Sequence, residues 1–139
     1  MKSIKPLLSL LFVATIFYGC TRVPITHRRQ TNLLPETDLM AMALTNYNQV
    51  LSESKVVQTG ANADQVKKVG EKISAAVTKY LEANGYASRV ANYNWQFNVI
   101  EDPTVNAWCM PGGKVAFYTG ILPICQNETG IAVVMGHEI

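Results

Sequence analysis

The chain has 139 residues, of which 48% are hydrophobic and 16% are charged, and its formal net charge is +2. This size and balance suit one modest globular domain, and so small a charge excludes an argument for nucleic-acid binding. Two of the basic residues, Lys2 and Lys5, lie in a segment that we expect to be removed, which would leave the mature chain close to neutral.

The first nineteen residues have the pattern of a secretory signal peptide. Lys2 and Lys5 form a charged start, residues 7–18 form an uncharged apolar run, and the small residue Gly19 follows. The run is too short for a membrane-spanning helix, which needs about 20 apolar residues. A charged start, a short apolar middle and a small residue before the cleavage point are typical of export, so we predict a signal peptide at residues 1–19.

Cys20 makes this signal more specific, because a Cys directly after Gly19 resembles the end of a bacterial lipoprotein signal. In that class the Cys is lipidated and becomes the new N-terminus. Phe17 and Tyr18 depart from the usual pattern, and an ordinary signal peptide or an uncleaved anchor is the alternative. We predict a lipid on Cys20 and a lipid-anchored protein of the cell envelope that faces the periplasm.

Residues 20–38 lack hydrophobic periodicity, and we predict that they tether the lipid to a domain that begins at residue 39. An exported chain folds where disulfides can form. Cys109 and Cys125 would then be able to pair, or they would be two small buried hydrophobic residues. The sequence leaves both interpretations open, because it does not place two thiols at bonding distance.

Two helices are predicted in the first half of the domain. From residue 39 to about residue 55, apolar residues fall at helical spacing. Residues 61–85 give the clearest helix, with Asn62 or Asp64 as the expected cap and Asn84-Gly85 supplying the left-handed residue at its end. The predicted core-facing stripe of this second helix consists of Val66, Val69, Ile73, Val77, Tyr80 and Leu81.

A small sheet is predicted next, because the apolar spacing changes from helical to alternating after Gly85. The tight turn Pro111-Gly112-Gly113 separates the last two strands, and its glycines permit positive φ angles. The predicted fold class is therefore α+β, with N-terminal helices followed by a small antiparallel or mixed sheet. The expected strands are residues 92–100, 104–110 and 114–120.

Residues 121–126 are expected to connect the sheet to a final helix. Asn127 is its predicted cap and Glu128 lies in its first turn, where a negative charge is favourable. Asn127 also begins a formal glycosylation sequon, but a helix cap explains this residue better. The expected apolar side of the helix consists of Ile131, Val134 and Met135.

His137 and Glu138 lie on this final helix and match the first two positions of the H-E-x-x-H signature. In that signature, two His residues one helical turn apart face the same zinc ion. The Glu after the first His activates a zinc-bound water as general base. The dipeptide alone is weak evidence, because a lone His on a helix is more often structural.

Four short motifs in a fixed order make the evidence specific. They resemble, in order and spacing, the zinc metallopeptidases related to HtpX and the CAAX prenyl protease, peptidase family forty-eight. The resemblance is specific from residue 95 to residue 139 and looser back to residue 39. It implies that the final helix is the start of a zincin active-site helix. The four motifs are Asn106-Ala107, Pro111-Gly112-Gly113, Tyr118-Thr119-Gly120 and Gly136-His137-Glu138.

The resemblance implies a zinc-dependent metalloendopeptidase that hydrolyses peptide bonds of exposed or misfolded cell-envelope proteins. His137 would be a ligand of the single zinc ion, and Glu138 would be the catalytic base. Backbone pairing along one strand would hold an extended or unfolded protein substrate. The alternative for that segment is an internal strand, and for Pro111-Gly113 a plain hairpin turn. The candidate substrate-binding residues are Lys114, Val115, Ala116, Phe117 and Tyr118.

Two departures from the family pattern limit this interpretation. The second His, at position 141, and a distant third ligand would lie beyond residue 139, and a catalytic zinc site needs three protein ligands. We therefore expect residues 39–139 to be the N-terminal part of a longer peptidase domain and to be inactive alone. Cys109 stands where a plain apolar residue is expected, and a buried small side chain is preferred over a redox role. The rival function is a non-catalytic envelope lipoprotein that serves as a binding or chaperone module.

Overall fold

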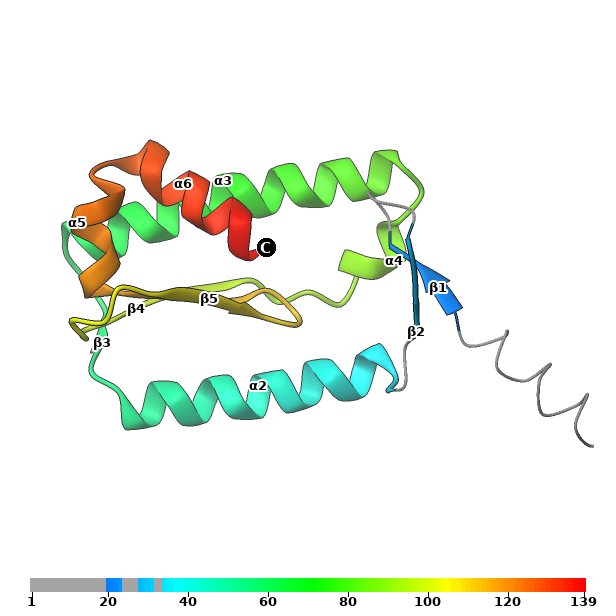
Figure 1. Cartoon of the computed structure of the whole chain (residues 1–139), viewed down its shortest axis with the longest axis horizontal. Coiled ribbons are helices and arrows are strands. Elements are labelled where there is room, and N and C mark those ends of the chain that lie inside the picture. Colours follow the sequence, from blue (N-terminus) through cyan, green and yellow to red (C-terminus); the bar gives the residue numbers. More distant parts are fainter. Residues whose placement is uncertain (1–19, 24–27, 32–33) are drawn as a thin grey trace, which may run out of the picture. The chain divides into compact units, whose positions relative to one another are not determined.

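The computed structural model describes residues 20–23, 28–31 and 34–139, which divide into two units, residues 1–36 and residues 37–139 (Figure 1). The predicted signal peptide lies outside the described residues. In the first unit, β1 (Cys20–Arg22) pairs antiparallel with β2 (Arg29–Thr31). This short hairpin falls within the predicted tether and was not expected, because the segment lacks an alternating pattern.

The second unit is an α+β domain, which confirms the predicted fold class. The predicted helices and strands occur in the expected order, and the strands from residue 96 to residue 118 replace helical structure as expected. The short elements at residues 56–57, 87–90 and 119–125 were not predicted. The elements are α2 (Glu36–Glu53), β3 (Val56–Val57), α3 (Ala61–Ala83), α4 (Ala87–Val90), β4 (Gln96–Ile100), β5 (Ala107–Met110), β6 (Lys114–Tyr118), the 3-10 turn η1 (Thr119–Ile121), α5 (Leu122–Cys125) and α6 (Glu128–Glu138).

The sheet of this unit is mixed, with strand order β3-β4-β6-β5. β4 and β6 are parallel, with Gln96 opposite Lys114, whereas β5 is antiparallel to β6, with Ala107 opposite Phe117. β3 adds a fourth strand antiparallel to β4. The sequence did not predict β3, because two residues are too few to show alternation.

Helices cover both faces of the sheet (Figure 1). On one face, α3 and α6 pack against Val99, Val115 and Phe117. On the other face, Tyr47 of α2 packs against Ile100 and Ala116. The alternation along β6 thus directs successive side chains to opposite helical layers, as a strand buried on both faces requires.

The ends of α3 correct one expectation and confirm another. Gly60 is the N-cap residue and no side chain caps the helix, so the predicted caps Asn62 and Asp64 are wrong, because both lie inside the first turn. At the other end, Gly85 has a φ of 81°, so the predicted left-handed residue is confirmed. Tyr80, predicted to face the core, is instead 49% exposed in the last turns of the helix.

Candidate active site

The start of α6 is fixed in the way that the sequence predicts. The Asn127 side-chain oxygen accepts hydrogen bonds from the backbone N–H groups of Thr129 at 2.9 Å and Gly130 at 3.1 Å. A Cβ at Gly130 would lie 1.9 Å from the carbonyl oxygen of Cys125, so only glycine lets this turn lie against the end of α5. The helix that carries His137 and Glu138 therefore begins at a well-defined point.

Two lysines of α3 hold the same end of α6, a feature that the sequence analysis missed. Lys68 Nζ lies 2.6 Å from Glu128 Oε1, and Lys72 Nζ lies 3.6 Å from Glu128 Oε2. The hydrogen bond from Lys68 is the main reason that the pKa of Glu128 falls below its ordinary value. The sequence pattern shows only that these lysines lie away from the core-facing stripe, because their partner is about sixty positions away in the chain.

His137 and Glu138 occupy the last turn of α6 and have different surroundings. His137 is exposed, whereas Glu138 is half-buried. Consecutive helical residues point about 100° apart, so the imidazole and the carboxylate leave the helix in different directions.

Cys109 on β5 lies close enough to Glu138 for the two to interact electrostatically. Burial is the main cause that raises the pKa of the Cys109 thiol to about 11, and the negative charge of Glu138 adds to the effect. Cys109 packs at the edge of the α3–α6 core. Cys109 and Cys125 are both free thiols, so the disulfide interpretation is not supported; Cys125 is buried and Cys109 is half-buried.

The residues that the structure describes supply one candidate zinc ligand. His137 offers an accessible imidazole, which suits zinc. Within residues 20–23, 28–31 and 34–139, no cluster of three His, Cys, Asp or Glu side chains stands ready to hold a metal. His137 thus fits the role of one zinc ligand, and the described residues do not supply the others.

The tight turn between β5 and β6 is confirmed. Gly112 and Gly113 have φ angles of 82° and 77°, in the left-handed region that favours glycine. A Cβ at Gly113 would also lie 2.6 Å from the Trp95 ring. Pro111-Gly112-Gly113 therefore sets the antiparallel pairing of β5 with β6.

The strand order corrects the position expected for a bound substrate strand. β6 lies between β4 and β5, so both of its backbone edges are already paired, and its first four residues are buried. The Lys114 ammonium donates to the backbone carbonyl of Asn94, and burial lowers its pKa. A substrate strand along residues 114–118 does not fit this order. β3 and β5 are the two edge strands among the described residues, and β5 is the one that packs beside α6.

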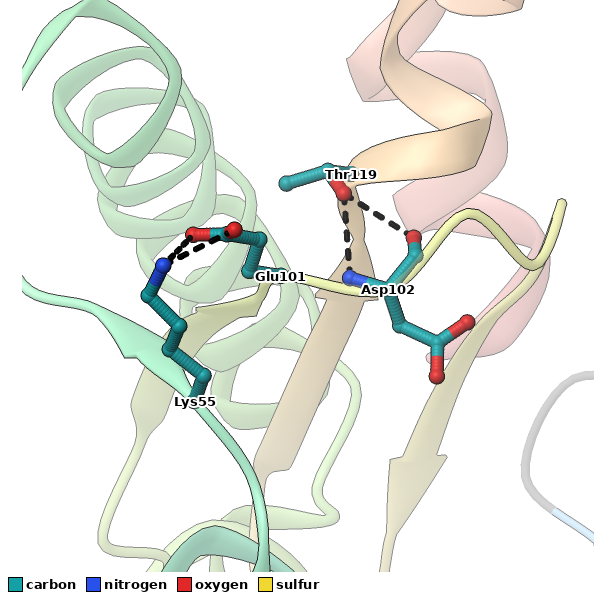
Figure 2. Close-up of polar contacts among 4 residues, drawn as sticks. All are labelled: Lys55, Glu101, Asp102 and Thr119. Atoms are coloured by element: carbon teal, nitrogen blue, oxygen red, sulfur yellow. Dashed lines mark hydrogen bonds and ion pairs between the residues drawn. The ribbon is translucent and has the colours of Figure 1, made fainter.

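The loop before β5 is bound to the end of β6 by the polar contacts drawn in Figure 2. The Thr119 hydroxyl accepts from the backbone N–H of Asp102 at 3.1 Å and donates to the backbone carbonyl of Asp102 at 2.9 Å. On the same loop, Glu101 forms an ion pair with Lys55 at 2.8 Å. The sequence identified Thr119 as part of a motif but did not predict its hydrogen-bond partner.

Comparison with known proteins agrees with this arrangement. The sequence model of the protein family named Peptidase family M48 matches residues 63–139, which is more than half of the chain. The chain therefore belongs to peptidase family M48, as the sequence motifs indicated. The matched region starts within α3 and includes the whole of the β4–β6 sheet and α6.

Several relatives have names that describe their chemistry. The mitochondrial metalloendopeptidase OMA1 of Schizosaccharomyces pombe is 34% identical over 116 residues, which cover 84% of this chain and 32% of that protein. OMA1 of Saccharomyces cerevisiae is 52% identical over 46 residues, 32% of this chain and 13% of that protein. The metalloprotease YcaL of Escherichia coli is 28% identical over 142 residues, covering 100% of this chain and 54% of that protein. The chain thus spans about a third of the length of the fission-yeast relative.

Proposed function

We propose that the full-length protein is a zinc-dependent metalloendopeptidase that cleaves exposed or misfolded proteins of the cell envelope. The observation that carries this proposal is the placement of His137 and Glu138 at the end of a capped helix that packs beside the free edge of β5. Membership of peptidase family M48 and relatives named as metalloendopeptidases support the same chemistry.

His137 would hold the zinc ion together with ligands from elsewhere in the full-length protein. Zinc supplies Lewis-acid polarisation of the scissile carbonyl and lowers the pKa of bound water. Glu138 would take a proton from the attacking water and then deliver it to the leaving amine, the ordinary sequence of general base and general acid. Its half-buried carboxylate lies on the side of α6 that faces Cys109 of β5, so the base is next to the free edge.

The β5 edge would hold the substrate as an added strand. Alternate backbone N–H and C=O groups of an edge strand point away from its partner and are ready to pair with an extended peptide. Such pairing depends on the substrate backbone and makes few demands on its side chains. A site of this kind favours extended or unfolded segments, which is why we propose misfolded proteins as substrates.

The lipid anchor on Cys20 remains a proposal about location. It would hold the enzyme on the membrane, facing the periplasm, and it rests on the sequence pattern around Gly19-Cys20. No helix among the described residues is long and apolar enough to cross a membrane. Replacement of Cys20 by Ser should release the protein from the membrane fraction; unchanged membrane association would contradict the anchor.

The experiment that tests the activity compares Glu138→Gln with His137→Ala in the full-length protein. Glu138→Gln keeps the size of the side chain but cannot take a proton, so cleavage of unfolded casein should fall by about 10²–10⁴-fold with zinc content unchanged. His137→Ala should lose both activity and zinc, because one of three ligands is gone. Zinc content is measured by elemental analysis.

Glu82→Gln is the matched control, because it makes the same chemical change at an exposed residue in the last turn of α3. It should leave cleavage and zinc content as in the parent. Near-parental cleavage by Glu138→Gln would contradict the assigned mechanism. Absence of metal-dependent cleavage by the parent itself would favour the non-catalytic binding module.

A further inference from the structure

The free edge of β5 is reached through a short loop, residues 101–106, that has its own hydrogen bonds. Thr104 N–H donates to the Asp102 carboxylate at 2.7 Å. Hydrogen bonds from the Thr104 side chain and then from its backbone N–H lower the pKa of Asp102. Asn106 N–H donates to the Thr104 carbonyl at 3.1 Å. Tyr118 N–H then donates to the Asn106 carbonyl at 3.1 Å, directly before the β5–β6 ladder begins. The loop is therefore hydrogen-bonded from its start to Asn106, the residue directly before β5.

Thr119 and Gly120 anchor the start of this loop. The Thr119 hydroxyl both accepts from and donates to the backbone of Asp102 (Figure 2). Gly120 N–H donates to the same Asp102 carbonyl at 3.0 Å. Asp102 is thereby held by three hydrogen bonds from two adjacent residues at the end of β6.

Gly120 also fits the loop sterically. A Cβ at this position would lie 2.1 Å from the Pro103 carbonyl oxygen and 2.6 Å from the Thr104 carbonyl oxygen. Real Cβ atoms do not approach backbone this closely, so a larger residue would push residues 103–104 away. The absence of a side chain at Gly120 lets the loop lie directly on the 3-10 turn η1.

We propose that Thr119, Gly120 and Asp102 form a clamp that positions the free edge of β5 for its substrate. The clamp fixes where β5 begins relative to β6, and hence where the backbone groups of Ala107–Met110 stand beside α6. Thr119 and Gly120 are positioning residues that act through the loop and the strand. This inference rests on the proposed peptidase function, because it assigns the edge to an extended protein substrate.

The Lys55–Glu101 ion pair provides a matched control on the same loop. It lies one residue before Asp102 and joins the loop to the segment before β3 (Figure 2). The two side chains are 75% and 53% exposed, so water screens the pair and it contributes little to the position of the loop. If the clamp positions β5, loss of the Lys55–Glu101 contact should leave the position of β5 unchanged. If any contact of the loop were enough to position β5, this loss would shift the strand.

The test uses the full-length protein with the substitutions Thr119→Val, Thr119→Ser and Lys55→Ala. Val keeps the shape of Thr but removes the hydroxyl, whereas Ser keeps the hydroxyl. With an unfolded protein substrate, Thr119→Val should raise KM about tenfold, the size of effect that one lost hydrogen bond produces, with kcat within about twofold. Thr119→Ser and Lys55→Ala should keep the parental KM.

The split between KM and kcat separates positioning from simple destabilisation. A loss of folded protein lowers the apparent kcat and leaves KM unchanged, so that result for Thr119→Val would overturn the clamp. Parental values of both constants in Thr119→Val would overturn it as well. A raised KM in Lys55→Ala would also contradict it, because the loop surface in general would then be responsible.

Amide hydrogen exchange tests whether the clamp holds the loop, and this test does not depend on enzymatic activity. In Thr119→Val, the hydrogen-bonded amides of Thr104, Asn106 and Gly120 should exchange faster than in the parent, and in Thr119→Ser they should not. A parent that cleaves no substrate would contradict the proposed function but leave this measurement intact. Unchanged exchange in Thr119→Val would show that the hydroxyl does not hold the loop and would overturn the clamp.

Discussion

The two faces of the β3-β4-β6-β5 sheet hold their helices by different means. The face that carries α3 and α6 is an apolar cluster in which Val66, Val115, Phe117 and Met135 are fully buried. The face that carries α2 has a polar centre. There the Tyr47 hydroxyl donates to the Val115 carbonyl at 2.8 Å and accepts from the Asn98 side-chain amide at 2.9 Å.

The two faces contribute to the site in different ways. Apolar packing is non-directional, so α6 is placed by close contact with the sheet and by its cap and lysine contacts. The bond from Tyr47 is directional and attaches α2 to the backbone of β6, one of the two inner strands of the sheet. Trp108 of β5 packs edge-on against the same ring at 5.6 Å, so α2 also supports the free edge.

The largest effect is expected on the apolar face. Phe117→Ala removes a fully buried ring between the sheet and the α3–α6 layer, and such truncations cost about 3–5 kcal/mol of unfolding free energy. Urea unfolding followed by circular dichroism measures the loss. Val133→Ala, at a side chain that is 70% exposed, should change stability by less than about 0.5 kcal/mol. Equal losses in the two variants would contradict the packing described for this face.

A smaller effect is expected on the polar face. Tyr47→Phe keeps the ring but leaves the Asn98 amide without its acceptor and the Val115 carbonyl without this donor, which should cost about 1–3 kcal/mol. Tyr80→Phe is the control, because the Tyr80 side chain is 49% exposed. If Tyr47→Phe unfolds at the parental urea concentration, the directional attachment of α2 is wrong.

The smallest effect concerns pH and the start of α6. The pKa of Glu128 is lowered in the folded state, chiefly by the hydrogen bond from Lys68, so its contribution is present above the ordinary carboxyl pKa. That contribution disappears as the pH falls below about 4.3 and through the lowered value. Thermal unfolding from pH 7 to pH 3 should therefore show a steeper acid decline in the parent than in Lys68→Met. Lys67→Met, on the exposed side of α3, should follow the parent, and parallel curves for all three proteins would contradict this assignment.

Much of this architecture follows from local patterns in the sequence. Helical spacing predicted α2 and α3, alternation predicted β4, the Pro111-Gly112-Gly113 turn separated the two strands predicted after it, and Asn127 predicted the start of α6. These signals are local because hydrogen bonds within a helix, and burial along a strand, repeat every few residues. The family motifs added the His137-Glu138 pair, whose roles remain predictions.

What the sequence did not predict depends on contacts between distant segments. The sequence predicted that β6 is a strand, but the order of strands in a sheet is set by long-range pairing, so the substrate-binding strand was assigned to β6, which has no free edge, instead of β5. The partner of Thr119 is Asp102, seventeen positions earlier, in a loop with no periodicity. The ion pairs of Glu128 join α6 to a helix about sixty positions before it.

The shortness of β5 has a consequence for self-association. A free strand edge that accepts an extended peptide will also accept the edge of another molecule, which is the usual start of strand-mediated aggregation. β5 has four residues, and Pro111, which follows it, has no backbone N–H to donate. The antiparallel turn at Gly112 and Gly113 then directs the chain back into the sheet. The exposed ladder is thus long enough to hold a short segment of a partner chain but too short to extend into a continuous intermolecular sheet.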